Sequence, residues 1–478
     1  MLAQIKRLGG DSLLYAFMNL GTKFIAFLMF PIYTYYLTPS EYGVIDLIDS
    51  TTAMLTFIVI FGTDSALAFY YFDVKDKAKR WAYVQNVLTF RLMVAFFFVL
   101  IVLIAGYSIS DVLLKDAGYF NALLFAVGVL FIDTIFALVL TVFRYEYKTL
   151  RVVLYTVGKM LLIAVISYVF LKYIWTSVEG IIAGRLIAVL FVLLLIGKPL
   201  LPFLRLKFDK PLLKEVLKYA APLVPASIAF WVIVNSNRFF LSEFGSMEDV
   251  GIYGSAMKFA TLITLVTSGV QMAWRPYSME LKNKEGNEQL FAKLYLGILL
   301  IGLFGVMAIT TVMPWVIQVL DDAYVASYQY VGLISAVTFL NFYYLIISVG
   351  LFVKKETKYI SYYFGVAAIV NVILNLVLIP KLSIWGTVVA YLISYVIAVV
   401  LIFHKSQKVY YIPISFFKMS ALFISTIILV SSMVWIQEND AVSDWHVLTA
   451  WVVFFLLIGI SRVDKDFRKK GHLGGSIE

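Results

Sequence analysis

The chain has 478 residues, of which 62% are hydrophobic and 14% are charged, whereas charged residues make up about 25% of a typical soluble domain. This composition excludes an ordinary soluble protein and predicts a polytopic membrane protein. With no cysteine and only three histidines, the chain lacks disulfides and thiolate nucleophiles, so we expect no metal, cofactor or catalytic residue. We expect the formal net charge of +10 to lie in cytoplasmic loops and not on a nucleic-acid-binding surface.

Apolar runs long enough to cross a bilayer follow one another along the whole chain. The first block contains six runs, at residues 12–36, 42–70, 83–105, 120–143, 152–171 and 178–200. After a basic linker, the second block contains six more, at residues 219–240, 250–273, 294–320, 328–353, 359–379 and 383–403. Residues 417–436 and 445–460 complete the set. The sequence therefore predicts an all-α protein with about fourteen transmembrane helices.

Lysine and arginine residues gather in alternate loops of this arrangement. About 30 of the 39 basic residues lie on one side, and about three, Lys115, Lys172 and Lys381, lie on the other. The positive-inside rule assigns the basic side to the cytoplasm, so we expect a multi-pass protein of the inner (plasma) membrane with both termini cytoplasmic. The first run is too long, and too polar at Lys23, for a cleaved signal peptide.

The two blocks of six helices resemble each other at a spacing of 208 residues. Residues 40–44 align with residues 248–252 at the turn into each second helix, and residues 177–180 align with residues 383–386 after a two-residue slip. Parallel repeats of this kind are typical of rocking transporters, although short apolar motifs can also match by chance. We expect an N-lobe at residues 1–208, a C-lobe at residues 209–404, and a C-terminal helix pair with a basic cytoplasmic tail at residues 405–478.

Sequence motifs for common membrane enzymes are absent. The chain contains no GxxxxGK[ST] phosphate loop and no HExxH metal motif, so we expect no ATP hydrolysis. A membrane glycosyltransferase or polysaccharide polymerase is the enzymatic alternative, and it needs acidic or basic groups on a sizeable external loop. The external loops here are short, and their acids are more simply solvated loop residues: Asp111, Asp116, Glu438, Asp440 and Asp444.

Two lysines lie near the middle of predicted spans. Lys23 is ~16 Å along the first helix from its cytoplasmic end, and Lys258 is ~12 Å along the eighth from its external end. An ionisable residue at such a depth costs about 2.5 to 3.5 kcal/mol on insertion scales and is a site candidate by default. A cationic cavity would bind a phosphate or diphosphate and repel cationic drugs. In the alternative interpretation, each lysine snorkels or binds backbone carbonyls between helices.

Other charged residues within the spans divide into two groups. Arg185 and Arg238 would join an anion path or anchor at the interface, whereas Arg91, Asp133 and Lys159 share a depth that suits an internal structural ion pair.

The acids of the second predicted helix and the prolines form two further groups of candidates. Three acids are possible sites for a coupling proton or sodium ion, with helix capping as the alternative: Asp46, Asp49 and Asp64. Three prolines lie in the first and seventh helices, where a missing amide donor permits bending, so they are candidate gates or static kinks: Pro31, Pro222 and Pro225.

Several short motifs resemble those of Wzx-type polysaccharide flippases. The first are residues 19–23 (Asn-Leu-Gly-Thr-Lys) and residues 37–43 (Leu-Thr-Pro-Ser-Glu-Tyr-Gly). Residues 221–225 (Ala-Pro-Leu-Val-Pro), 237–241 (Asn-Arg-Phe-Phe-Leu) and 250–253 (Val-Gly-Ile-Tyr) resemble the start of that family's C-lobe. The motifs are shared across the multidrug/oligosaccharidyl-lipid/polysaccharide (MOP) exporter superfamily, which includes lipid II flippases and multidrug and toxin extruders of the MATE-like fold. The family's usual Asp-Arg pair reads Asn237-Arg238 here.

This resemblance implies a cargo and a mechanism. The cargo would be an undecaprenyl-diphosphate-linked oligosaccharide, such as an O-antigen unit of lipopolysaccharide, moved to the external leaflet by alternating access and an ion gradient. Lys23 and Lys258 match the helices on which the lipid II branch places cavity cations, and the last two helices would form a groove for the lipid tail. The implied partners are this lipid-linked substrate, membrane lipids, H⁺ or Na⁺, and polysaccharide assembly proteins. A drug extruder of the same fold is the alternative.

Overall fold

The computed structural model describes residues 2–281, 286–438 and 444–460. These residues form helices, turns and loops and contain no β-strand, so the protein is an all-α polytopic membrane protein as predicted. Eleven helices in the described residues are long and apolar enough to cross a membrane, or twelve if one bent pair counts as a single span. All fourteen predicted segments lie on helices.

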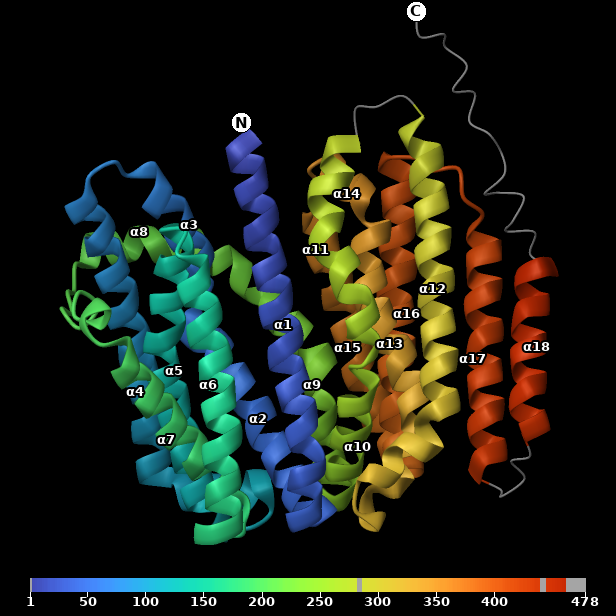
Figure 1. Cartoon of the computed structure of the whole chain (residues 1–478), viewed down its shortest axis with the longest axis horizontal. Coiled ribbons are helices and arrows are strands. Elements are labelled where there is room, and N and C mark those ends of the chain that lie inside the picture. The colour runs from blue at the N-terminus through green and yellow to red at the C-terminus, as the bar shows by residue number, and fades with distance from the viewer. Residues whose placement is uncertain (1, 282–285, 439–443, 461–478) are drawn as a thin grey trace, which may run out of the picture. The chain divides into compact units, whose positions relative to one another are not determined.

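The first of two compact units is Met1–Gly251. Its core combines apolar faces of several helices, including Tyr83, Val139 and Val142 in one cluster and Val44, Ile48 and Ile181 in another. The helices of this unit are α1 (Leu2–Tyr36), α2 (Pro39–Ile60), α3 (Thr63–Asp73), α4 (Lys77–Leu114), α5 (Phe120–Tyr145), α6 (Thr149–Val169), α7 (Val178–Ile196), α8 (Lys210–Ala220), α9 (Val224–Phe244) and the start of α10 (Met247–Ala260) (Figure 1).

The second compact unit is Ile252–Glu478. The sequence repeat places a boundary after residue 208, whereas the contacts of α8 and α9 with α2, α3 and α4 join these two helices to the first unit. The predicted lobe boundaries therefore stay a prediction. The helices of this unit are the rest of α10, α11 (Ile263–Leu281), α12 (Asn287–Val316), α13 (Tyr328–Ile347), α14 (Val349–Val353), α15 (Lys358–Leu382), α16 (Ile384–Val409), α17 (Phe416–Glu438) and α18 (Asp444–Ile460) (Figure 1).

Helices α2 and α10 start with the same local structure at positions 208 residues apart. At the start of α2, Thr38 N–H donates to Glu41 Oε2 at 2.8 Å, and Glu41 N–H donates to Thr38 Oγ1 at 3.3 Å. At the start of α10, Ser246 N–H donates to Asp249 Oδ2 at 3.1 Å, and Asp249 N–H donates to Ser246 Oγ at 3.0 Å. Both are capping boxes, which satisfy amide donors that a helix start leaves unbonded.

The second predicted span of each block is broken, although the sequence predicts one helix in each case. Helix α2 ends at Phe61, whose φ of 47° is left-handed, and Gly62 (φ 69°) leads into α3. A left-handed residue ends a helix because it turns the following amide away from the helical ladder. In the second block, α10 and α11 meet at a bend of 51° across residues 261–262. Each break therefore places short helix ends in the middle of a predicted span.

Candidate functional site

Asp46 and Arg238 form a buried ion pair that joins α2 to α9. Arg238 Nε donates to Asp46 Oδ2, and only 8% and 7% of the Arg238 and Asp46 side chains are exposed. Arg238 Nη1 also donates to the carbonyl of Val234 at 3.1 Å. Trp231 Nε1 donates to the carbonyl of Ser50 at 3.2 Å, one turn further along α2. Although residue 237 is asparagine, Arg238 therefore has an acidic partner, supplied by another helix.

Asp49 and Arg185 form a second pair, between α2 and α7. Arg185 Nη1 donates to Asp49 Oδ1 at 2.6 Å, and 41% of the Asp49 side chain is exposed. Both residues line a cavity of about 110 Å³ inside the first unit. The hydroxyl residues Thr52 and Thr56 and the carboxylate of Asp133 line the same cavity. This small chamber therefore presents two acids and one base to whatever occupies it.

Asp133 and Lys159 form a third pair, between α5 and α6, as their shared depth predicts. Lys159 Nζ donates to the two oxygens of Asp133 at 3.0 and 3.2 Å. The same ammonium lies 4.7 Å from the ring centroid of Phe136, which adds a cation–π contact. Lys159 is therefore held between a carboxylate on the cavity wall and an aromatic face.

Arg91 pairs with Asp64, and not with the Asp133–Lys159 pair that the sequence grouped with it. Arg91 Nη2 donates to Asp64 Oδ1 at 2.7 Å, and its Nε and Nη2 donate to Thr63 Oγ1 at 2.8 and 2.7 Å. The expected grouping is corrected because the break at Phe61 and Gly62 starts α3 beside α4. The guanidinium, with 1% of the Arg91 side chain exposed, is satisfied by the first two residues of α3.

The two mid-span lysines lie in different compact units. Lys23 is on α1 with an exposed side chain, and Lys258 is on α10 with a half-buried one. In the described part of the second unit, no carboxylate lies within ion-pair distance of Lys258. Their role as substrate-binding cations stays a prediction.

The three candidate gating prolines occupy different helical positions. Pro31 lies inside α1, whose helix continues past it to Tyr36. Pro222 lies in a single 3₁₀ turn, Ala221–Leu223, and Pro225 lies in the first turn of α9. Pro222 and Pro225 thus mark a change of helix type at the start of α9, while their role as gates stays a prediction.

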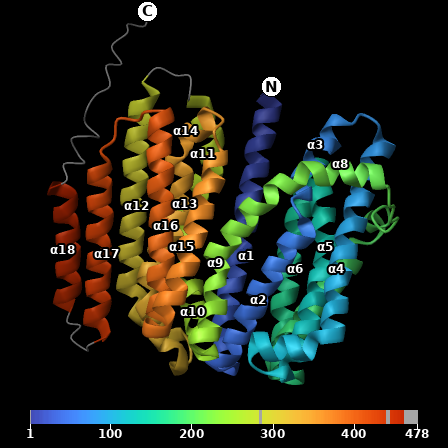
Figure 2. The same ribbon diagram turned by 180° about the vertical axis from the view of Figure 1, so that it is seen from behind.

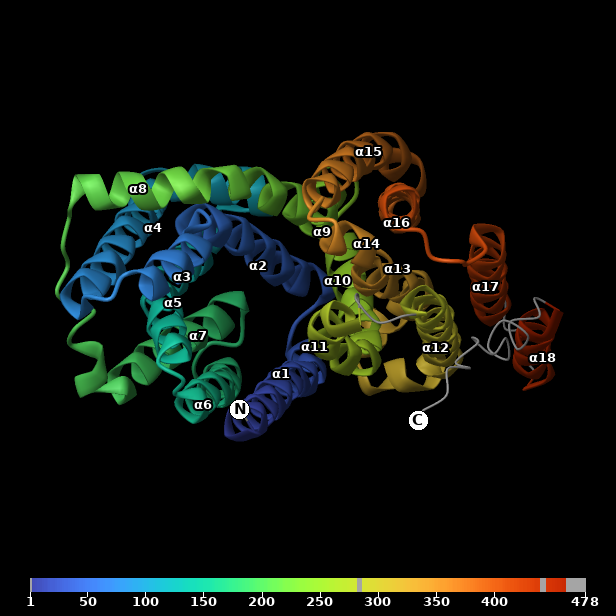
Figure 3. The same ribbon diagram turned by 90° about the horizontal axis from the view of Figure 1, so that it is seen from above.

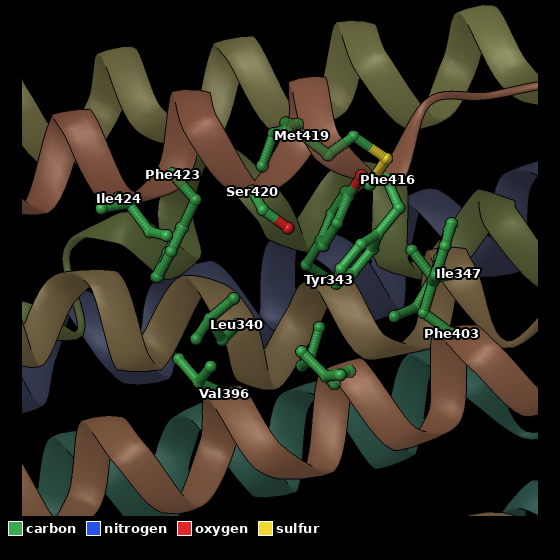
Figure 4. A pocket seen from close by; sticks show the side chains of 13 residues that line it. Leu340, Tyr343, Ile347, Val396, Phe403, Phe416, Met419, Ser420, Phe423 and Ile424 are labelled. Atoms are coloured by element: carbon green, nitrogen blue, oxygen red, sulfur yellow. The ribbon is translucent and has the colours of Figure 1, made fainter.

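An apolar pocket of about 340 Å³ lies in the second unit among α12, α13, α16 and α17. Figure 4 shows side chains from α13, α16 and α17 pointing toward one another around it. They include Leu340, Tyr343, Val396, Met419 and Phe423, and Ser420 contributes a hydroxyl. The sequence alone suggested an apolar groove only from the resemblance, on the last two helices, whereas the pocket is lined by α17 together with three helices of the second block.

Comparisons with known proteins decide the family. Residues 8–282 match the family model described as "Polysaccharide biosynthesis protein". The chain belongs to the polysaccharide biosynthesis protein family. A search of curated protein sequences found no match. Among the described residues, no group of three or more His, Asp and Glu side chains could hold a metal ion.

Solved structures with a similar fold include a lipid II flippase and a MATE family transporter of the MOP superfamily. Lipid II flippase MurJ, in an inward closed conformation, matches with a TM-score of 0.59 and 12% identity over 95% of this chain and 99% of that chain. An inward-facing MATE family multidrug resistance transporter matches with a TM-score of 0.57 and 16% identity over 84% and 94% of the two chains. MATE in a straight conformation matches with a TM-score of 0.53 and 16% identity over 87% and 96%. At these identities the likeness establishes the fold.

Proposed function

We propose that this protein is a flippase for undecaprenyl-diphosphate-linked oligosaccharide, which it moves from the cytoplasmic to the external leaflet by alternating access. The observation that carries the proposal is the family match over residues 8–282 in a chain with the fold of a lipid II flippase. A head group with many hydroxyls and two phosphates cannot cross hydrocarbon alone, because each unsatisfied polar group costs several kcal/mol. The protein supplies the polar route.

The charges of the spans support an anionic cargo over a cationic drug. The four candidate acids Asp46, Asp49, Asp64 and Asp133 each have an arginine or lysine partner. Lys23 and Lys258 add positive charge within the spans, and a compact ammonium with three donors suits phosphate oxygens. Arg185 and Arg238 would reach the same anion only by exchanging their carboxylate partners. The two lysines are therefore the main proposed diphosphate ligands.

The apolar pocket supports a role for the second unit in holding the lipid tail. Its walls are almost entirely hydrocarbon and aromatic, and it lies among helices that are candidate membrane spans. An isoprenoid chain is purely apolar, so burying part of it there requires no hydrogen bond. We propose that part of the tail occupies this pocket while the head group moves.

Ion coupling, as proposed here, uses the cavity beside Asp49 and Arg185. A proton or sodium ion that binds at Asp49 or Asp133 would weaken one of the two ion pairs on the cavity wall, Asp49–Arg185 or Asp133–Lys159. A single ion could thus change which helices of the first unit are held together. We also propose a location in the inner membrane with cytoplasmic termini, together with polysaccharide assembly proteins that use the exported unit.

Leaflet-specific analysis of lipid-linked sugars tests the proposed function. In cells that lack the gene, the complete lipid-linked unit should accumulate on the cytoplasmic side, and the intact gene should restore it to the external side. Accumulation outside as unextended units would instead indicate a polymerase. Unchanged sidedness together with greater sensitivity to cationic drugs would indicate an extruder, the second candidate, which the similarity to MATE transporters favours.

A further inference from the structure

The segment between α7 and α8 is held against α4 at several points. Gln85 Nε2 donates to the carbonyl of Pro202 at 3.0 Å, and the backbone N–H of Asp209 donates to Asn86 Oδ1 at 2.5 Å. Between these two points the ring of Phe203 is buried and lies 5.2 Å from the ring of Trp81. The path of this backbone is therefore fixed by the helix beneath it.

Helix α8 continues this attachment. Tyr83 on α4 donates its hydroxyl to Glu215 Oε2 at 2.8 Å, and the apolar side chains Leu213 and Val216 are buried against the unit. Figures 2 and 3 show α8 lying across the ends of its neighbours instead of alongside them. This orientation is that of a helix parallel to a membrane surface, since α4 and α7 are candidate spans.

Residues 204–208 are exposed and alternate between apolar and basic. Large apolar side chains are exposed at Leu204, Leu206 (53%) and Phe208 (60%). Arg205 and Lys207 lie between them and Lys210 follows, all three exposed. We call these six residues the interfacial surface. Because the neighbouring backbone is anchored, their exposure is a feature of the fold and does not come from a loose loop.

The charge of the interfacial surface is available to an external partner. Within the described residues, Arg205, Lys207 and Lys210 form no ion pair. The nearby acids bond to neutral donors instead of these cations: Asp209 caps α8 by accepting from Leu212 N–H at 3.2 Å, and Glu215 accepts from Tyr83. Only the short segment 197–203 separates the surface from Ile196, where the candidate span α7 ends, so we expect the surface to lie close to the border of the membrane.

We propose that the interfacial surface binds anionic lipid headgroups, with Leu204, Leu206 and Phe208 inserted beneath them. Interleaved lysine, arginine and large apolar side chains suit a layer that is negatively charged outside and apolar below. The predicted orientation puts this surface on the cytoplasmic side, where the leaflet carries anionic lipids. A protein partner would favour a contiguous apolar centre with charges at its rim, whereas here charges separate the apolar side chains.

A probe at Leu206 tests this proposal, since the chain contains no cysteine and a single introduced thiol can be labelled. Full-length Leu206→Cys would carry a polarity-sensitive dye in nanodiscs of phosphatidylcholine alone or mixed with phosphatidylglycerol. We expect a blue shift and about a twofold rise in quenching by brominated acyl chains in the anionic discs, and added salt should reverse both. This readout needs no translocation activity, so it remains valid even if the proposed cargo is wrong.

Two charge-neutralised forms complete the experiment. Replacing Arg205, Lys207 and Lys210 by glutamine should abolish the response to anionic lipid. The matched control replaces three exposed lysines of the same unit that lack exposed apolar neighbours in alternation, Lys75, Lys77 and Lys79, and should retain the response. Equal quenching in both kinds of disc, a dye that stays in water in both, or loss of the response in the control would overturn the proposal. Quenching that needs an added protein would identify a protein interface instead and would also overturn it.

Discussion

Gly43 and Gly251 occupy equivalent positions 208 residues apart and lie against each other at the starts of α2 and α10. A Cβ atom on Gly43 would lie 2.1 Å from the carbonyl oxygen of Met247, and one on Gly251 would lie 1.8 Å from that of Pro39. Pro39 and Met247 are themselves 208 residues apart, so the contact is reciprocal. Equivalent positions of the sequence repeat therefore pack against each other within the first unit.

Replacing either glycine by alanine should destabilise the protein. The new methyl group would overlap a backbone carbonyl, which cannot rotate away, and overpacking of this kind costs about 1–3 kcal/mol, more than the gain in helix propensity. The melting temperature of Gly43→Ala and Gly251→Ala in detergent, followed by size-exclusion chromatography after heating, measures the effect. Gly365→Ala on α15 is the control, because a Cβ there meets nothing within 4 Å. Melting temperatures equal to that of Gly365→Ala would contradict the expected clash.

Replacing one partner of the Asp46–Arg238 pair should lower the free energy of unfolding by more than replacing both partners. Either Asp46→Leu or Arg238→Leu alone leaves one buried group without its partner, with an expected loss of about 3–5 kcal/mol. The double replacement Asp46→Leu and Arg238→Leu removes both charges and should lose less than the sum of the single replacements. A double-mutant cycle on unfolding in denaturant measures the coupling, and additive losses would show that the two side chains act independently.

Arg91 should not tolerate lysine. Its guanidinium donates to Thr63 and Asp64 with two nitrogens, and an ammonium cannot reproduce that planar arrangement, so we expect Arg91→Lys to lower stability by about 1–3 kcal/mol. The matched control is Arg151→Lys on α6, where the side chain is exposed. Thermal unfolding of the two variants in the same detergent measures this effect. Equal melting temperatures would contradict a structural role for the guanidinium of Arg91.

The proposed cationic ligands should depend on charge at Lys23 and Lys258. We expect Lys23→Ala and Lys258→Ala to reduce surface polysaccharide while protein levels in the membrane stay normal, and the arginine variants should retain more activity because they keep the charge. Lys408→Ala in the last turn of α16, an exposed lysine, serves as the control. Full surface polysaccharide in the double alanine variant would rule out the proposed site.

Filling the apolar pocket should interfere with the proposed tail binding. Ser420→Phe adds a ring to a pocket that is otherwise apolar, and it removes a hydroxyl from that surface. We expect lower photolabelling by an isoprenoid probe with a melting temperature close to that of the parent protein. Ile424→Ala, at the same pocket, enlarges it and should preserve labelling. Undiminished labelling of Ser420→Phe would place the tail elsewhere.

The sequence predicts the helices better than the partners of their charged residues. Long apolar runs predict transmembrane helices directly, so each of the fourteen segments is helical, although the second segment of each block is broken into two helices. The break after Ile60 was missed because Phe61 has no preference for a left-handed backbone, and only Gly62 gave a local signal. Depth along the helix grouped Arg91, Asp133 and Lys159, and of these three only Asp133 and Lys159, on consecutive helices, pair with each other. It was not enough for Arg238 and Asp46, which are 192 residues apart and meet only through tertiary packing.

Because α8 is attached to α4, the position of the first turn of α9 is fixed relative to α4. Tyr83 and Asn86 hold α8 and the segment before it, and α8 runs through a single 3₁₀ turn directly into α9. A tilt of α4 would therefore move α8 and, through the 3₁₀ turn that contains Pro222, also the first turn of α9, which contains Pro225. A movement of α4 would in this way be passed to Arg238, which lies more than three helical turns along α9.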